Sequence, residues 1–308
     1  MRSRLHNRTM TAMAVVGVAL LVSGCAAQSW GTPPPAENTP QAPVTPPATF
    51  PALPEAPPGQ PPASFVGLDA RLQQATADAA DSGAEITAVV LDRNTGQTAA
   101  SGANQSFPIA SVVKLFIADD LLLQESEGKI KLSAADRAAL DSMLRSSDDS
   151  AAQNFWDRSG GNAVIARVKS RYGLGGTTAP YNGHWDVTTS TASDLVRYYD
   201  KLLNGTGGLP PEQANIIIGN LAQSTPTGND GYPQRFGIPE GLYAEPVAVK
   251  QGWFCCWSGP NQLHVSTGVI GADRRYVMAI SSLDPTSEAA ARANITQAVK
   301  TMFPGGTL

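Results

Sequence analysis

Residues 107–117 read FPIASVVKLFI, and this stretch decides how the rest of the chain is interpreted. Pro108 breaks the preceding structure, and the apolar run after it predicts a helix of a dozen or more residues. Ser111 then falls in the first turn, where free N–H groups and the helix dipole favour a developing anion. Lys114 lies one turn further on the same face, within reach of the serine hydroxyl. A desolvated lysine can take the serine proton, so the pair is a candidate nucleophile and base.

Two later segments carry polar residues that fit the same chemistry. Residues 143–153 read MLRSSDDSAAQ, with Ser147 at the head of a Ser-Asp-Asp triplet, and residues 247–253 read VAVKQGW, with Lys250 at the head of Lys-Gln-Gly. A lone Ser-x-x-Lys arises often by chance, and the ordinary interpretation is two surface lysines and a helix cap. The occurrence of all three segments in this order favours a shared site.

Together the three segments resemble the Ser-x-x-Lys, Ser-Asp-Asn and Lys-Thr-Gly motifs of class A β-lactamases and penicillin-binding proteins. Phe-Pro before the serine, Ala-Ala after the second motif and the threonine-rich residues 188–191 add to the resemblance, which covers roughly residues 66–308. The interval from the first to the second motif is shorter than in the family, which predicts a trimmed helical lobe.

The resemblance implies a role for each motif residue. Ser111 would be the nucleophile, Lys114 its general base, and Ser147 a proton carrier toward the leaving group. Lys250 would hold a substrate carboxylate, and the N–H groups of Ser111 and Trp253 would form the oxyanion hole. The implied substrates are cell-wall peptides or β-lactam-like molecules.

The second and third motifs also depart from the family pattern. Asp149 replaces an asparagine, and a carboxylate near Lys114 would raise the pKa of the lysine and make it a poorer base. Gln251 replaces the hydroxyl residue and would either donate an amide N–H or fill the space of a substrate carboxylate. We expect Asp149, Gln251, Gly252 and Trp253 to be the substrate-binding residues.

The loop glutamate with which class A β-lactamases hydrolyse the acyl-enzyme has no counterpart, because no glutamate lies between Glu127 and Glu212. We interpret Asp186 as a structural loop anchor and His184 as a packed or solvated side chain. We therefore expect poor lactam turnover by a weak or specialised serine hydrolase. The alternative is a catalytically degenerate binding or scaffold module.

Residues 253–257 read WFCCW, directly after the third motif. Their aromatic side chains would line a hydrophobic subsite or plug the groove. Cys255 and Cys256 reach an oxidising space after export. Adjacent Cα atoms lie about 3.8 Å apart, below the usual disulfide range of about 4.4–6.8 Å, so a vicinal disulfide and two free thiols both stay open.

The first 64 residues predict export and tethering. Residues 1–24 combine a basic start with a short apolar run and end in a lipobox-like LVSG before Cys25, which predicts a lipoprotein signal peptide and acylation of that cysteine. Residues 25–64 hold 13 of the 24 prolines and predict an extended tether. Residues 65–308 would form the β-lactamase-like domain, held on the outer face of the bacterial membrane.

The composition of the chain limits the classes of ligand and partner that it is expected to bind. The net charge of −4 becomes −7 when Arg2, Arg4 and Arg8 are removed, since 19 basic residues then face 26 acidic ones. This balance argues against nucleic acid. The three histidines show no ligand spacing, so we expect no metal and no cofactor. We expect a monomer that acts on peptidoglycan peptide or another small acyl substrate and contacts the membrane through its lipid.

Periodicity predicts an α/β (α+β) fold. Apolar residues at four- and three-residue spacing predict a first helix over residues 68–79, and a last helix begins at residue 287. One antiparallel sheet would be flanked by these terminal helices, with an all-helical lobe inserted between its second and third strands. The predicted strands are residues 86–92, 97–101, 247–250, 263–270 and 276–281, and the predicted lobe helices are residues 111–125, 134–145, 149–157, 163–172, 192–203 and 212–221.

Overall fold

A computed structural model describes residues 65–308 of the chain. The predicted signal peptide, Cys25 and the proline-rich tether lie outside the described residues. Within residues 65–308, no helix combines the length and the apolar character that a membrane crossing requires.

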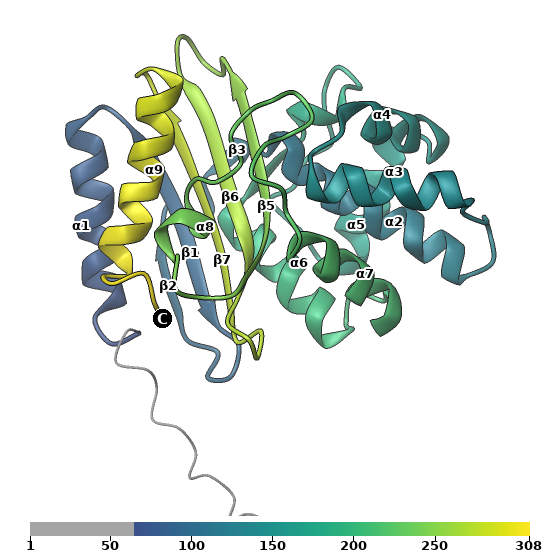
Figure 1. Ribbon diagram of the computed structural model, residues 1–308, viewed down its shortest axis with the longest axis horizontal. Helices are drawn as coiled ribbons and strands as arrows, with labels where there is room; N and C mark the ends of the chain where they lie inside the picture. The colour runs from purple at the N-terminus through teal and green to yellow at the C-terminus, as the bar shows by residue number, and fades with distance from the viewer. Residues whose placement is uncertain (1–64) are drawn as a thin grey trace, which may run out of the picture. The chain divides into compact units, whose positions relative to one another are not determined.

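The described part contains a five-stranded antiparallel sheet whose strand order is β2-β1-β7-β6-β5 (Figure 1). The terminal helices α1 (Leu68–Asp81) and α9 (Glu288–Met302) pack together on one face of it (Figure 1). This is the predicted fold class. The strands are β1 (Glu85–Asp92), β2 (Thr98–Ser101), β5 (Val247–Cys255), β6 (Gln262–Ile270) and β7 (Tyr276–Asp284).

The predicted helical lobe is inserted between β2 and β5 in the chain, and β5 is the sheet edge that faces it (Figure 1). A short pair of strands, β3 (Ser106–Pro108) and β4 (Thr189–Thr191), connects the two halves. The lobe helices are α2 (Lys114–Ser126), α3 (Ala134–Arg145), α4 (Asp149–Arg158), α5 (Asn162–Tyr172), α6 (Ala192–Asn204) and α7 (Pro211–Leu221), with α8 (Ile238–Gly241) following before β5.

Side-chain caps fix where several lobe helices begin. Ser133 and Asp136 form a reciprocal capping box at α3, and Asp148 accepts the N–H of Ala151 at the start of α4. Each cap satisfies backbone N–H groups that have no partner inside the helix. The cap at α4 fixes the turn that carries Ser147 and Asp149, so it also positions candidate site residues.

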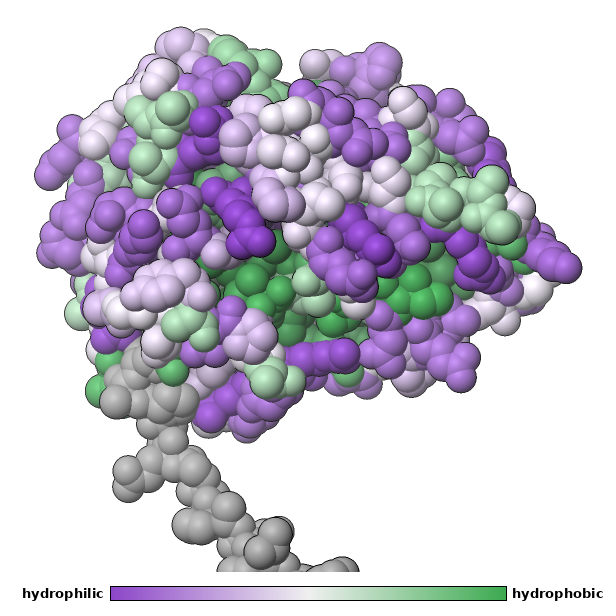
Figure 2. Space-filling model, in the orientation of Figure 1, coloured by the Kyte–Doolittle hydropathy of each residue, from purple (hydrophilic) through white to green (hydrophobic). Residues whose placement is uncertain are grey.

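Helix α2 is the centre of the lobe. Its residues from Lys114 to Leu122 are all buried, and the apolar ones among them belong to the larger hydrophobic core, which also includes residues of the sheet. Asp119 lies inside this core and accepts bonds from Arg171 and from the hydroxyls of Tyr172 and Tyr198, which ties α5 and α6 to α2. On the face shown in Figure 2, strongly hydrophobic residues gather in a recess between the sheet and the lobe.

The structure corrects the local prediction around the first motif. The helix predicted from Ser111 begins with a 3-10 turn, η1 (Ala110–Val113), and α2 starts at Lys114. The strand predicted for residues 247–250 continues to Cys255. Strands β3 and β4 were not predicted, because three residues are too few to show a period and their pairing joins distant segments.

The packing of α1 can be tested at Leu72, which is fully buried between α1 and the sheet. Leu72→Ala should lower the free energy of unfolding by roughly 2–5 kcal/mol through lost burial and a residual cavity. Gln73→Ala, at the exposed neighbouring position, should change it by less than about 0.5 kcal/mol. Urea unfolding of residues 65–308 measures both, and equal effects would contradict the described packing.

Candidate active site

Ser111 lies in η1, at the point where β5 of the sheet meets the helical lobe. Its Oγ is 2.7 Å from Nζ of Lys114, as the three-residue spacing predicts. Ser111 is largely buried but lines a cavity, whereas Lys114 is completely covered. The serine is thus open to a small molecule, and its amine partner is shielded from water.

The Lys114 amine contacts three segments of the chain, which carry Ser111, the pair Ser147 and Asp149, and Trp185. Besides Ser111, it donates to the carbonyl oxygen of Ser147 at 2.8 Å and to Oδ1 of Asp149 at 2.5 Å. It also lies 4.7 Å from the ring centre of Trp185. The predicted contact between Asp149 and the lysine is therefore present.

Burial and Asp149 shift the pKa of Lys114 in opposite directions. Burial disfavours the charged form and lowers the pKa of Lys114, and this effect is the largest. The charge and hydrogen bond of Asp149 raise the pKa, as expected from the sequence, but the net pKa of Lys114 stays below its ordinary value. The lysine is a better base than the sequence alone suggests.

Ser147 connects the two amines of the site. Its φ of 55° is in the left-handed region, and this conformation directs its carbonyl oxygen to Lys114 while its Oγ accepts a bond from Nζ of Lys250. Lys250 also donates to the carbonyl oxygen of Gln251 at 3.1 Å. Burial, and next the nearby charge of Lys114, hold the pKa of Lys250 well below its ordinary value.

Gly252 allows the edge strand β5 to approach η1. A Cβ atom at this position would lie 2.6 Å from the carbonyl oxygen of Ile109 and 3.3 Å from the backbone N of Ser111. The backbone that leads into Trp253 therefore passes beside Ser111 N, where the predicted oxyanion hole requires it.

Gln251 does not serve as the predicted substrate-binding residue. It follows Lys250 on a strand and so points to the opposite side. Its amide donates to the carbonyl oxygens of Gln234 at 3.0 Å and Phe236 at 2.6 Å, inside the protein. The longer side chain neither donates into the cavity nor fills it, because it instead binds the segment that precedes β5.

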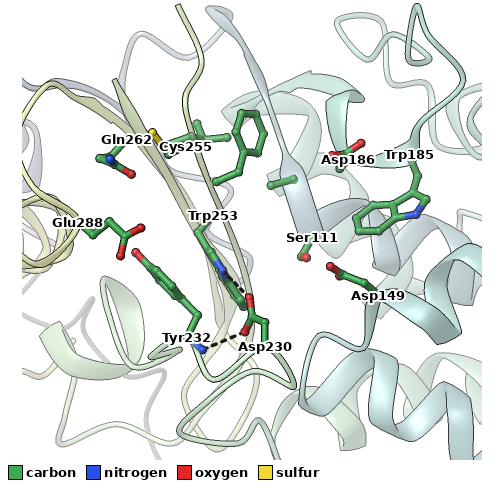
Figure 3. Close-up of a pocket in the computed structure, with 13 residues that line it drawn as sticks. Ser111, Asp149, Trp185, Asp186, Asp230, Tyr232, Trp253, Cys255, Gln262 and Glu288 are labelled. Atoms are coloured by element: carbon green, nitrogen blue, oxygen red, sulfur yellow. Dashed lines mark hydrogen bonds between the residues drawn. The ribbon is translucent and has the colours of Figure 1, made fainter. Parts of the chain in front are cut away.

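The cavity at Ser111 has a volume of about 390 Å³ (Figure 3). Of the predicted set, Ser111, Asp149 and Trp253 line it, whereas Lys114, Ser147 and Lys250 lie behind its wall. The full lining is Ala110, Ser111, Asp149, Trp185, Asp186, Asp230, Tyr232, Trp253, Phe254, Cys255, Gln262, Leu263 and Glu288.

Several lining residues were not predicted as site residues. Asp230 and Tyr232 come from the loop before α8, and Glu288 begins α9, so no sequence motif connects them. Asp186 was interpreted as a loop anchor, but within residues 65–308 its side chain has no hydrogen bond or ion pair and it lines the cavity. His184 beside it is exposed.

The aromatic segment forms part of the cavity wall. Trp253 stacks on Tyr232 with ring centres 4.9 Å apart, and its Nε1 donates to Asp230 at 3.2 Å. Phe254 also lines the cavity, while Trp257 packs edge-on against Phe254. The segment lines the cavity without filling it.

Cys255 and Cys256 are joined in a vicinal disulfide, with Cys255 at the cavity wall. In the part of the chain that the structure describes, no three histidine, cysteine, aspartate or glutamate side chains gather as a metal site would require.

The contact between β5 and η1 yields a test with a matched control. Gly252→Ala should lower the free energy of unfolding by roughly 1–3 kcal/mol, because the added methyl group meets backbone atoms. Gly219→Ala, in α7 where a Cβ meets nothing within 4 Å, should raise it by roughly 0.5–1 kcal/mol. Thermal unfolding distinguishes them, and a stable Gly252→Ala protein would refute the close approach.

Comparisons with known proteins agree with this geometry. A family model described as "Beta-lactamase enzyme family" matches residues 68–135. A protein named "Putative lipoprotein LppW", from both Mycobacterium tuberculosis and Mycobacterium bovis, is 60% identical over 255 residues, which cover 83% of this chain and 81% of the relative.

Solved structures share the fold at low sequence identity. The extended-spectrum β-lactamase TLA-3 has a TM-score of 0.63 at 13% identity and covers 76% of this chain and 98% of its own. The structure titled PBP-A has a TM-score of 0.62 at 20% identity and covers 77% and 94%. The chain therefore belongs to the family of these mycobacterial proteins that bear a lipoprotein name, and it has the fold of the serine β-lactamases and of PBP-A.

Proposed function

We propose that this chain is an acyl-serine enzyme of the cell envelope, a weak or specialised hydrolase or transpeptidase-like enzyme of cell-wall peptide or β-lactam-like substrates. The 2.7 Å contact between Ser111 Oγ and Nζ of Lys114 carries this proposal. A buried lysine with a lowered pKa can take the serine proton without a histidine.

Acylation would proceed along the described contacts. Neutral Lys114 accepts the proton of Ser111, and Oγ attacks the substrate carbonyl carbon. The N–H groups of Ser111 and Trp253 would then stabilise the tetrahedral oxygen. The proton that Lys114 took from Ser111 would pass through Ser147 Oγ to the leaving group, while the hydrogen bond from Nζ of Lys250 holds Ser147 Oγ in position.

Hydrolysis of the acyl-enzyme would be the slow step. The segment between Glu127 and Glu212 contains no glutamate to activate water. An acyl group on Ser111 should therefore persist long enough to be detected, and β-lactams should behave as inhibitors more than as substrates.

The lipoprotein name of the relatives supports placing this chemistry outside the cytoplasm. We propose that Cys25 is acylated after removal of residues 1–24. The tether of residues 25–64 would then hold the domain in the periplasm or cell wall, where cell-wall peptides are available.

A covalent adduct tests the nucleophile. Incubation of residues 65–308 with a fluorophosphonate or a fluorescent penicillin should add one label to Ser111, identified by peptide mass spectrometry. Ser111→Ala should abolish labelling, and Ser150→Ala, at an exposed serine of α4, should retain it. If Ser111 stays unlabelled after long exposure, the chain has no acyl-serine activity.

The Asp149 contact favours a second candidate, a degenerate binding or scaffold module. A carboxylate 2.5 Å from Lys114 stabilises the ammonium form, which accepts no proton, and Gln251 is withdrawn from the cavity. Hydrolysis of a D-alanyl-D-alanine peptide that is lost in Ser111→Ala would exclude this second function.

Asp149→Asn tests how strongly the contact with Asp149 raises the pKa of Lys114. Since Asp149 raises the pKa of Lys114, its removal should lower that pKa further and move the rise of the acylation rate to lower pH. Labelling near neutral pH should become several times faster. Asp157→Asn, which removes a charge at the exposed end of the same helix, should leave the pH profile unchanged. Identical profiles for all three proteins would show that the carboxylate does not restrain Lys114.

A further inference from the structure

We propose that the acyl substrate of this site is cationic and carries an ammonium group beside the reacting carbonyl. This inference rests on the proposed function and names its substrate class. It starts from the cavity beside Ser111, whose charged and aromatic lining selects what can approach the nucleophile.

The groups expected to hold a substrate carboxylate are not available in the cavity. Lys250 is covered and bonded to Ser147 and to the carbonyl oxygen of Gln251. The Gln251 amide is bonded to two backbone carbonyl oxygens. Among the lining residues of the described chain there is no lysine or arginine. An anionic group entering here would meet no unpaired positive charge.

Carboxylates line both sides of the approach to Ser111 (Figure 3). Asp149 and Asp186 come from the helical lobe, and Asp230 and Glu288 from the sheet side. Asp149 is paired with Lys114, and Asp230 accepts from Trp253 and from the N–H of Tyr232. Asp186 and Glu288 make no hydrogen bond or ion pair within residues 65–308, so their charges are free to attract a ligand.

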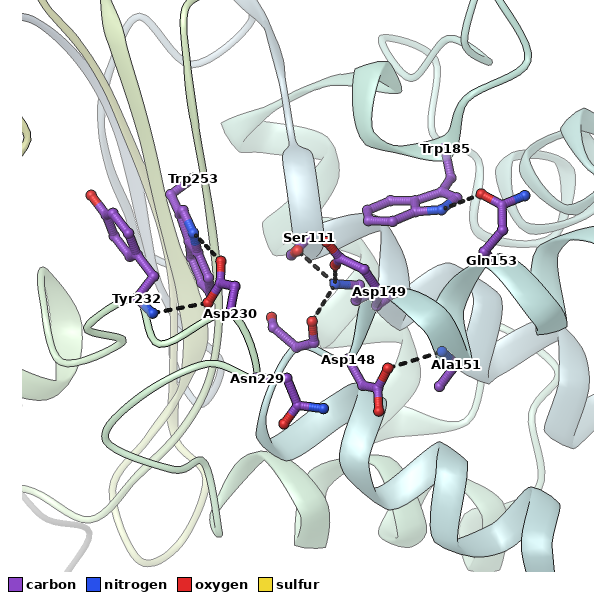
Figure 4. Close-up of polar contacts among 12 residues, drawn as sticks. Ser111, Asp148, Asp149, Ala151, Gln153, Trp185, Asn229, Asp230, Tyr232 and Trp253 are labelled. Atoms are coloured by element: carbon purple, nitrogen blue, oxygen red, sulfur yellow. Dashed lines mark hydrogen bonds and ion pairs between the residues drawn. The ribbon is translucent and has the colours of Figure 1, made fainter.

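Aromatic faces complete a surface suited to an ammonium group. Tyr232 stacks on one side of Trp253, which leaves the opposite side of the indole toward Ser111 (Figure 4). An ammonium over an indole face and beside carboxylates is stabilised by both. Arg292 lies 4.8 Å from the ring centre of Tyr232, but it does not line the cavity.

The site already surrounds one amine in this manner. The Lys114 amine lies 4.7 Å from the ring centre of Trp185 and contacts Asp149, so an indole and a carboxylate together surround it. Trp253 with Asp230 places the same two group types on the other side of Ser111. Trp253 and Asp230 face the cavity. A substrate cation can therefore contact them as the Lys114 amine contacts Trp185 and Asp149.

Three probes that differ only in charge test the inference. Activated esters of one skeleton, carrying an alkylammonium, a neutral amide or a carboxylate beside the acyl group, are reacted with residues 65–308. The second-order rate of Ser111 acylation is followed by mass spectrometry. The ammonium ester should react about tenfold or more faster than the carboxylate ester at low salt, and the difference should shrink at high salt.

Variants that remove carboxylates from the cavity wall test which residues cause the preference for the ammonium ester. The double variant Asp186→Asn with Glu288→Gln should reduce the ratio of ammonium to carboxylate rates severalfold. Asp81→Asn removes one charge at the end of α1, away from the cavity, and should retain the ratio. A preference that survives the double variant would show that these carboxylates do not select the substrate.

The outcomes separate this inference from the proposed function. Equal rates for all three esters, or a faster carboxylate ester, overturn the charge preference while acylation itself stands. If no ester labels Ser111, the proposed function fails, and calorimetric titration of the corresponding non-reactive amides then decides the charge question. A carboxylate amide that binds as tightly as the ammonium amide overturns the inference.

Discussion

The burial of one lysine amine is the constraint on which the site depends. Lys114 begins the central helix of the lobe and is completely covered, so its amine must find partners inside the protein. It finds them on Ser111 and on Ser147 and Asp149, which belong to two segments far apart in the sequence. The contacts that satisfy this buried amine are therefore also the contacts that align the proposed nucleophile, its proposed base and the proposed proton carrier.

The second constraint is the distance between the sheet edge and η1. Gly252 lets backbone pass where any side chain would collide with Ile109 and Ser111, which brings the N–H donors of two elements together. The residues immediately after it then define the cavity wall, since Trp253, Phe254 and Cys255 all line it. One glycine thus fixes the approach of β5 to η1, on which both the proposed oxyanion hole and the position of the cavity wall depend.

The fold and the candidate catalytic residues could be predicted from the sequence. Helix and strand periods predicted the elements, and the resemblance of three ordered motifs to a known family placed Ser111, Lys114, Ser147 and Lys250 in one region, as the structure also places them. The position of the Gln251 side chain was not predicted. Whether a side chain on a strand enters a cleft depends on what packs beside that strand.

The remaining differences from the sequence prediction have the same origin. Asp230, Tyr232 and Glu288 come from separate segments that only the tertiary fold brings to one cavity. The effect of Asp149 on the lysine was predicted with the right sign, but the larger effect of burial required knowing that Lys114 is covered.

The two buried lysines explain why a candidate nucleophile lies beside a cavity lined by carboxylates. Lys114 and Lys250 are close enough for each charge to disfavour the other, while Asp149 is the only carboxylate that contacts either amine within residues 65–308. Two ammonium groups with one such counter-charge are unfavourable in a covered site, so burial favours a neutral Lys250. A neutral Lys250 can donate an N–H to Ser147 but offers little attraction to a substrate carboxylate. The same electrostatics that prepare the amines for proton transfer therefore weaken anion binding, and the carboxylates at the cavity wall are left to select a cation.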